Sequence, residues 1–141
     1  MTSIEVETTS YQVEKRDWLL SPHGTEPGAM PSVTVDFSLF TAATHAPNGY
    51  IPSGIVLAKV TATGLYGPYD PDGSDGRETA KGHLFGQLKF PASGTGKAGG
   101  AILRHGFVDA AKLPLATAGN GTEGKLDAAA RTDLGLIDYE N

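Results

Sequence analysis

The chain has 141 residues and a formal net charge of −5 at pH 7, a balance that disfavours nucleic acid or an anionic membrane as a partner. It has no cysteine, which excludes disulfides, thiolate nucleophiles and zinc–cysteine sites. The length suits one domain and most of the 19 glycines fall where turns are expected, so the composition predicts a soluble, turn-rich, mainly β domain.

Neither a membrane span nor a secretory signal is expected. No apolar run approaches the roughly 20 residues that a helix needs to cross a bilayer. The first residues, MTSIEVETTS, lack a basic region followed by an apolar core.

Residues 1–31 differ in composition from the rest, so we predict an extended N-terminal arm over 1–31 and one β-rich domain over 32–141. The stretch SPHGTEPGAMP (21–31) is a run of structure breakers. A floppy terminus is one interpretation, and an arm that folds onto a partner is the other. Fixing a backbone residue costs about 1–2 kcal/mol, so we expect the arm to be mobile until it binds. The residues expected to bind the partner are Ile4, Val6, Tyr11, Trp18 and Leu19.

The remaining chain reads as strands joined by turns. SVTVDFSLF (32–40) alternates apolar and polar residues, which predicts a half-buried strand. Further strands are expected over 55–63, 65–69, 78–90, 101–108 and 136–139, with a turn cluster at 70–76 and a flexible loop at 91–100.

Helix signals are few. Asp109 is a plausible N-cap for a short turn over 110–113, which Pro114 ends. KLDAAARTD (125–133) predicts a helix, with Gly135 as its C-terminal cap.

Two glycine-rich strings partly match nucleotide-binding motifs and fail on context. The GxGxxG string at 94–99 requires a helix after it, whereas a strand is predicted there. The string at 119–125 is close to a phosphate-binding loop, but Leu126 stands where a hydroxyl should ligate Mg²⁺. Both are interpreted as loops.

Asp70, Asp72 and Asp75 suggest a calcium loop, but the spacing does not fit an EF-hand. Counted from Asp70, position 6 is Asp75 where glycine is needed, and position 12 is Lys81 where glutamate is needed. A solvated turn is the default interpretation, and an adventitious cation at the three carboxylates stays open.

No catalytic constellation is apparent. The four histidines are far apart in sequence and are expected to be surface or hydrogen-bonded strand residues: His23, His45, His83 and His105. Ser53 lacks the flanking glycines of a nucleophile elbow. We therefore predict no enzymatic activity, no cofactor and no metal site.

Three segments taken together resemble a known family. SGIVLAKVTATG (53–64), YGPYDPDGSDGRETAKGHLF (66–85) and AILRHGFVDAAKLP (101–114) are similar to the head decoration proteins of tailed bacteriophages, the family of the phage lambda protein. In that family a G-x-VL-x-K-V strand precedes a Y-x-PYDP…DG loop, an A-x-G-x-L return and an R-H-G-x-V strand. The resemblance covers roughly residues 50–115, and the order of the pieces is its most specific feature.

The resemblance implies a fold and a function. The fold would be a bent-ribbon, β-clip or β-tulip-like small barrel with an extended arm and one or two short helices. The protein would be a structural homotrimer, made in the host cytoplasm, on the outer capsid surface of the virion. It would bind the major capsid protein at three-fold positions of an expanded head and stabilise the shell against packaged DNA.

Two alternatives stay open. Pro52-Ser53-Gly54 and GLID (135–138) faintly resemble motifs of trimeric dUTP pyrophosphatases. Their spacing differs, no basic cluster offers a triphosphate clamp, and the chain ends at Asn141 before a glycine-rich closing segment. The second alternative is a non-viral β-rich module that binds a ligand or lattice.

Overall fold

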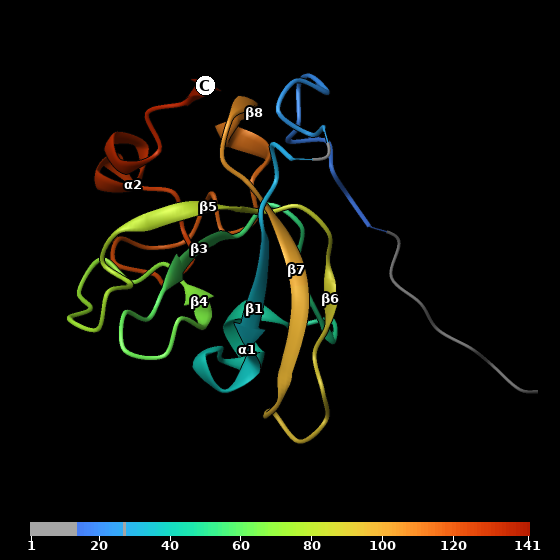
Figure 1. Ribbon diagram of the computed structural model, residues 1–141, viewed down its shortest axis with the longest axis vertical. Coiled ribbons are helices and arrows are strands. Elements are labelled where there is room, and N and C mark those ends of the chain that lie inside the picture. Colours follow the sequence, from blue (N-terminus) through green and yellow to red (C-terminus); the bar gives the residue numbers. More distant parts are fainter. Residues whose placement is uncertain (1–13, 27) are drawn as a thin grey trace, which may run out of the picture.

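A computed structural model describes residues 14–26 and 28–141 and confirms the mainly β fold (Figure 1). The strands of this part are β1 (Ser32–Asp36), β2 (Tyr50–Ile51), β3 (Val56–Lys59), β4 (Tyr66–Pro68), β5 (Ala80–Leu84), β6 (Leu88–Lys89), β7 (Lys97–Leu103), β8 (Gly106–Asp109) and β9 (Ile137–Glu140). The helices are α1 (Ala42–His45) and α2 (Ala128–Asp133), with 3-10 turns at Phe37–Leu39 and Ala110–Lys112. Within the described residues no helix is long and apolar enough to cross a membrane.

Five strands form a small barrel in the order β1-β4-β3-β5-β7. The longest strand pairing in the barrel is the antiparallel β1–β7 pair, which runs from Ser32↔Ala101 to Asp36↔Lys97. The barrel closes between β1 and β4 through a single parallel residue pair, Val35↔Tyr66. It is therefore a loosely closed barrel. Two small sheets, β2–β6 and the parallel β8–β9 pair, lie outside it.

Two apolar cores lie on opposite faces of the barrel wall. Alternate residues such as Leu57 point inward and pack with Val35 and Ile102 in the barrel core. Their neighbours Val56 and Ala58 belong instead to a second core outside the barrel. Strand β3 is thus buried on both faces, which is why it reads as a continuous apolar run.

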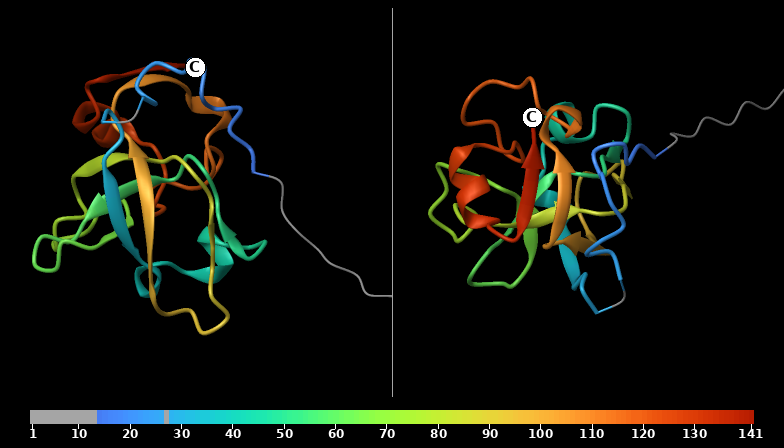
Figure 2. Two further views of the ribbon diagram at one scale, coloured as in Figure 1. Left: turned by 45° about the vertical axis from the view of Figure 1, so that its right-hand side comes forward. Right: turned by 90° about the horizontal axis from the view of Figure 1, so that it is seen from above.

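The second core is covered by a set of segments that we call the terminal layer: residues 16–20, β8, β9 and α2. Seen from above, β8 and β9 lie side by side, with the N-terminal segment next to β8 (Figure 2). Helix α2 begins where Asp127 Oδ1 accepts a hydrogen bond from the Ala130 amide, at 2.8 Å. Its last residue, Asp133, accepts one from the Ala80 amide of β5 at 3.0 Å, which attaches the helix to the barrel.

Several predicted boundaries are corrected. The strand over 32–40 ends at Asp36, because the Asp36 carboxylate accepts a hydrogen bond from the Ser38 amide and caps a 3-10 turn. The predicted strand over 101–108 is two strands, separated before Gly106, whose φ of 151° only glycine adopts readily. Part of the predicted 91–100 loop is strand, because β7 begins at Lys97.

The predicted caps were partly right. Asp109 does cap the turn Ala110–Lys112, accepting a hydrogen bond from the Ala111 amide at 3.1 Å. Gly135 directly follows the C-cap residue of α2, at the predicted position, but it does not adopt the left-handed conformation of a capping glycine. Leu134 occupies the C-cap position with φ −98°, and its amide donates to the Ala130 carbonyl, so no left-handed glycine is needed.

Candidate functional site

The residues expected to bind a partner fall into two groups. Ile4, Val6 and Tyr11 lie outside the described residues. Trp18 is in the second core with 1% of its surface exposed, so in this structure it contacts the protein's own domain. Leu19 is half-buried against the same core and bridges Val108 of β8. The packed part of the chain therefore begins before residue 32.

Trp18 is held by a pocket built for an indole. Its Nε1 donates to Ser53 Oγ at 3.2 Å, and Ser53 Oγ donates to the Phe85 carbonyl at 2.6 Å. Gly54, at φ 98°, lies so close that an added Cβ would be 2.8 Å from the indole nitrogen. A burial of this size contributes several kcal/mol to folding, about 3–5 by the cost of truncating a core tryptophan.

The segment before Trp18 is clamped to the loop after β5. The Arg16 guanidinium lies 3.9 Å from the centre of the Phe85 ring, and its Nε donates to the Phe85 carbonyl at 3.1 Å. Its Nη2 pairs with Glu14 at 2.7 Å, and Glu14 Oε1 in turn accepts from the Gln87 amide. These contacts fix the first described residues, from Glu14 onward, against the domain.

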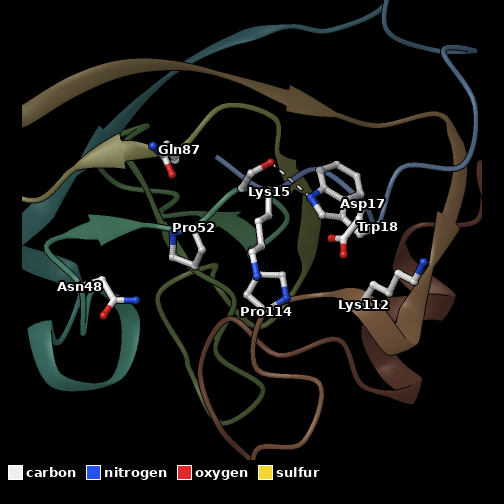
Figure 3. A pocket seen from close by; sticks show the side chains of 9 residues that line it. Lys15, Asp17, Trp18, Asn48, Pro52, Gln87, Lys112 and Pro114 are labelled. Carbon is white, nitrogen blue, oxygen red and sulfur yellow. Dashed lines mark hydrogen bonds between the residues drawn. The ribbon is translucent and has the colours of Figure 1, made fainter. Parts of the chain in front are cut away.

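A cavity of about 410 Å³ lies beside this clamp (Figure 3). It is lined by Lys15, Asp17, Trp18, Asn48, Pro52, Ser53, Gln87, Lys112 and Pro114. Figure 3 shows Trp18, Asp17 and Lys112 on one side, Pro52 and Asn48 on the other, and the Lys15 side chain between them. Ser53 uses its hydroxyl on Trp18 and Phe85 as described. The cavity thus marks where the N-terminal segment meets the domain.

A buried histidine joins the N- and C-terminal segments. His83 Nδ1 is 2.8 Å from the Gly54 carbonyl and donates to it, so Nε2 is the acceptor for the Tyr139 hydroxyl at 2.6 Å. The Trp18 ring lies 5.7 Å away on the other side. Burial lowers the pKa of His83 to about 4 and raises that of Tyr139, so at neutral pH the imidazole is uncharged.

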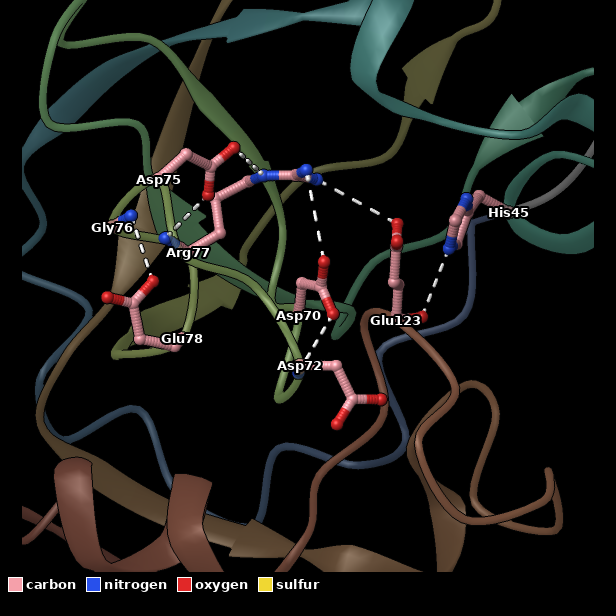
Figure 4. A network of polar contacts seen from close by, with 8 residues as sticks. All are labelled: His45, Asp70, Asp72, Asp75, Gly76, Arg77, Glu78 and Glu123. Carbon is pink, nitrogen blue, oxygen red and sulfur yellow. Dashed lines mark hydrogen bonds and ion pairs between the residues drawn. The ribbon is translucent and has the colours of Figure 1, made fainter.

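The acidic loop is organised around an arginine (Figure 4). Arg77 forms ion pairs with Asp75 at 3.0 Å, Glu123 at 3.8 Å and Asp70 at 4.0 Å. Asp72 serves the turn itself, where its amide donates to Asp70 Oδ1. Of the three carboxylates predicted to form a solvated turn, those of Asp70 and Asp75 are therefore tied to a side chain of their own loop. Among residues 14–26 and 28–141, no group of three acidic, histidine or cysteine side chains is arranged to hold a metal.

His45 extends this network toward α1. Its Nδ1 accepts from the Thr41 amide at 2.9 Å, so Nε2 donates to the Glu123 carbonyl at 3.0 Å. Burial lowers the pKa of His45, and burial next to Asp70 raises that of Glu123. The histidine is hydrogen-bonded within the fold, as predicted. His23 and His105, which are far apart in sequence, are brought together by the fold, with ring centres 4.5 Å apart.

The nucleotide-like strings have no binding geometry in the described structure. The 94–99 string runs into strand β7, as expected. Lys125, at the end of the 119–125 string, donates its Nζ to the Ala118 carbonyl of the same loop. Asp138, from the dUTP pyrophosphatase-like string, lies exposed on β9.

A family model described as bacteriophage lambda head decoration protein D matches residues 33–137. The chain belongs to this family. Head decoration proteins are structural proteins of the phage capsid, so the membership gives this chain a capsid as its partner and the virion as its location. A comparison with curated proteins gave no match.

The family match begins at Val33, beyond the described N-terminal segment, and ends at the first residue of β9. Trp18 and Tyr139, which contact His83, therefore lie outside the matched residues. No periodicity in the sequence pointed to these contacts, because they join single residues from segments 56 or more positions apart.

Proposed function

We propose that this head decoration protein binds as a homotrimer to the outer surface of an expanded phage head, at three-fold positions on the major capsid protein. Bound there, it stabilises the shell against the pressure of packaged DNA. The observation that carries the proposal is the family match over residues 33–137. Trimerisation is supported by composition, because a chain with few aromatic residues gains by burying surface against its own copies.

In this proposal the segment that binds the capsid, residues 1–13, is shorter than the arm over 1–31 expected from composition. Ile4, Val6 and Tyr11 contact the capsid. Trp18 and Leu19 serve the same contact indirectly, by anchoring the base of the arm in the domain. A capsid strand edge can pair with the main chain of residues 1–13, and the apolar side chains then add specificity.

Anchoring the arm at Trp18 lowers the cost of binding. Each backbone residue that becomes fixed costs about 1–2 kcal/mol, and residues 14–20 are already fixed by the clamp to Phe85 and β8. Three arms on one trimer act together through their effective concentration, so a modest affinity of each arm suffices.

The test uses expanded heads assembled without the decoration protein by the phage that encodes this chain. The intact protein and a variant lacking residues 1–13 are mixed with these heads, which are then pelleted and washed with salt. We expect the intact protein to saturate the heads and the shortened one to be lost in the wash. Because the deletion stops before Glu14, the clamp is preserved, and the urea midpoint of the variant serves as the folding control.

Full occupancy by the shortened protein after the same wash would refute the role of residues 1–13 in capsid binding. Failure of the intact protein to bind would refute the proposed function. Oligomeric state is measured separately by sedimentation at micromolar concentration. A trimer is expected, and a monomer throughout would contradict that part of the proposal.

A further inference from the structure

Three large apolar side chains of the described chain are strongly exposed: Leu20 and Phe107 lie in the terminal layer, and Leu136 directly precedes its strand β9. Leu136 is 69% exposed, Leu20 48% and Phe107 40%. They come from three segments that are far apart in sequence. Backbone hydrogen bonds to β8 bring them together: the Leu20 amide donates to the Phe107 carbonyl, and the Gly106 amide donates to the Leu136 carbonyl.

Strands β8 and β9 are parallel, with Val108 paired to Tyr139 and Phe107 paired to Asp138. Val108 and Ile137 point into the second core, so Phe107 and Asp138 point outward, because side chains alternate along a strand. Leu136 lies in the turn just before β9, where its carbonyl accepts a hydrogen bond from the Gly106 amide at 3.4 Å and its side chain is exposed beside the start of β8.

The N-terminal segment completes this face. Leu19 bridges Val108 and packs into the core with it. Leu20 follows, and its amide donates to the Phe107 carbonyl at 3.1 Å, which places Leu20 beside Phe107 on the outward side. We call this surface the outer face of the terminal layer: Leu20, His105, Phe107, Leu136 and Asp138.

The outer face is held firmly. The His23 ring meets the His105 ring edge-on at 4.5 Å and the Phe107 ring at 5.9 Å. Two glycines allow this close approach of the backbones. A Cβ on Gly24 would lie 1.7 Å from the His105 carbonyl oxygen, and one on Gly106 would lie 2.8 Å from the His23 carbonyl oxygen. Exposed apolar side chains grouped on an ordered surface are a feature of interaction sites.

We propose that the outer face of the terminal layer is a second capsid-contacting surface of the domain, in addition to the arm. The inference rests on the proposed function. Its argument is continuity: residues 18–20 form one edge of the outer face and are also the anchored base of the arm. A shell that binds residues 1–13 is therefore brought alongside Leu20 and Phe107. The matching shell surface is apolar, with a hydrogen-bond donor or cation opposite Asp138.

A second copy of the chain is the competing occupant. A three-fold ring is built from a contact between two different patches, one on each neighbour. In residues 14–26 and 28–141 the strongly exposed large apolar side chains gather on a single face. A trimer would carry this patch three times on the same side. Three such patches can contact one external surface together, whereas a ring contact would need a second, different patch on each subunit.

The test is a double variant, Phe107→Ser with Leu136→Ser, in the full-length chain. Both side chains are exposed, so the fold is expected to survive, and the urea midpoint checks this. The matched control is Ala92→Ser with Thr95→Ser in the exposed connection between β6 and β7, at the opposite end of the molecule from β8 (Figure 1). We expect the outer-face variant to need at least about tenfold more protein for half-occupancy of undecorated heads. The control should bind as the unchanged protein does.

Equal binding by the outer-face variant and the control would overturn the inference while leaving the arm and the proposed function intact. A change in oligomeric state of the free outer-face variant would overturn it too, because the face would then join copies of this chain. Hydroxyl-radical footprinting of the unchanged protein gives an answer that does not depend on variants. Phe107 and Leu136 should be protected on heads and reactive in the free protein, and undiminished reactivity on heads would contradict the inference.

Discussion

The inside of the barrel and the terminal layer are held together in different ways. In the barrel core, aliphatic side chains such as Leu57, Leu84 and Ile102 are buried inside a ladder of strands. In the terminal layer, buried polar groups decide which segments meet, above all the His83 contacts with Gly54 and Tyr139. Burial of apolar surface is non-directional, whereas hydrogen bonds select particular partners.

The barrel core therefore mainly supplies stability, whereas the contacts of the terminal layer determine where its segments lie. The barrel needs only apolar residues of suitable size at alternating positions. The terminal layer must bring the arm base, β8 and β9 to one end of the molecule in fixed register, and its polar contacts do this. Because these contacts rest on single polar groups, the stability of the terminal layer should be sensitive to pH and to single substitutions.

The largest effect is expected at the arm base. Trp18→Ala should lower the free energy of unfolding by about 3–5 kcal/mol, because it empties a core position and leaves Ser53 without the indole donor. Urea denaturation measures it. Leu20→Ala, two residues away on the outer face, is the control and should cost less than about 1 kcal/mol. Similar losses for the two variants would show that the arm base is no part of the core.

Acid should weaken the terminal layer next. The folded pKa of His83 is about 4, below its ordinary value of 6.5, so the unfolded chain binds a proton between these pH values that the folded chain does not. The free energy of unfolding should fall by about 3 kcal/mol as pH drops from 6.5 to 4, and should not change on this account above 6.5. His45, whose pKa is also lowered, acts in the same direction.

Urea midpoints measured across this range in the unchanged protein and in His83→Asn isolate the effect. The variant keeps a donor for the Gly54 carbonyl but cannot titrate, so it should be less stable at neutral pH and lose less stability in acid. Parallel pH dependence of the two proteins would contradict the role given to His83.

A smaller effect is expected in the acidic loop, which belongs to the barrel. Arg77→Gln should cost about 1–2 kcal/mol, because three partly exposed carboxylates lose their common partner. Thermal or urea unfolding measures it, with the exposed Lys59→Gln as the control for loss of one positive charge. A cost no greater than that of the control would show that the loop is a solvated turn without structural pairing.

The smallest effect concerns turnover, where none is expected. Purified protein should hydrolyse dUTP no faster than buffer, since Ser53 is engaged in holding Trp18 and Asp138 lies exposed on β9. Hydrolysis well above background that is abolished by Asp138→Asn would overturn the structural assignment.

The barrel was largely predictable, because its signals are local. Alternation at Val33 and Val35 gave β1, and the apolar run at 55–58 gave β3. Asp109 and Asp127 cap their turns by contacts within three residues. Such features depend on short-range geometry, which a sequence displays directly.

The terminal layer was not predictable, because its contacts are long-range and rest on single residues. Trp18 was predicted to belong to a mobile arm, since charged residues (14–17) precede the short apolar patch 18–20 and a run of breakers (21–31) follows it. Nothing local shows that Ser53 and Gly54 form its pocket. The shared face of Leu20 and Phe107 likewise requires the register of segments more than 80 residues apart. For residues 14–20, long-range packing produced an ordered segment where the composition had predicted a mobile one.

The most direct test of the account is electron cryo-microscopy of expanded heads incubated with the intact protein. We predict density at the three-fold positions of the outer surface, with the terminal layer facing the shell and the β6–β7 connection pointing to solvent. Heads without added density, or density in which the terminal layer faces solvent, would contradict the account.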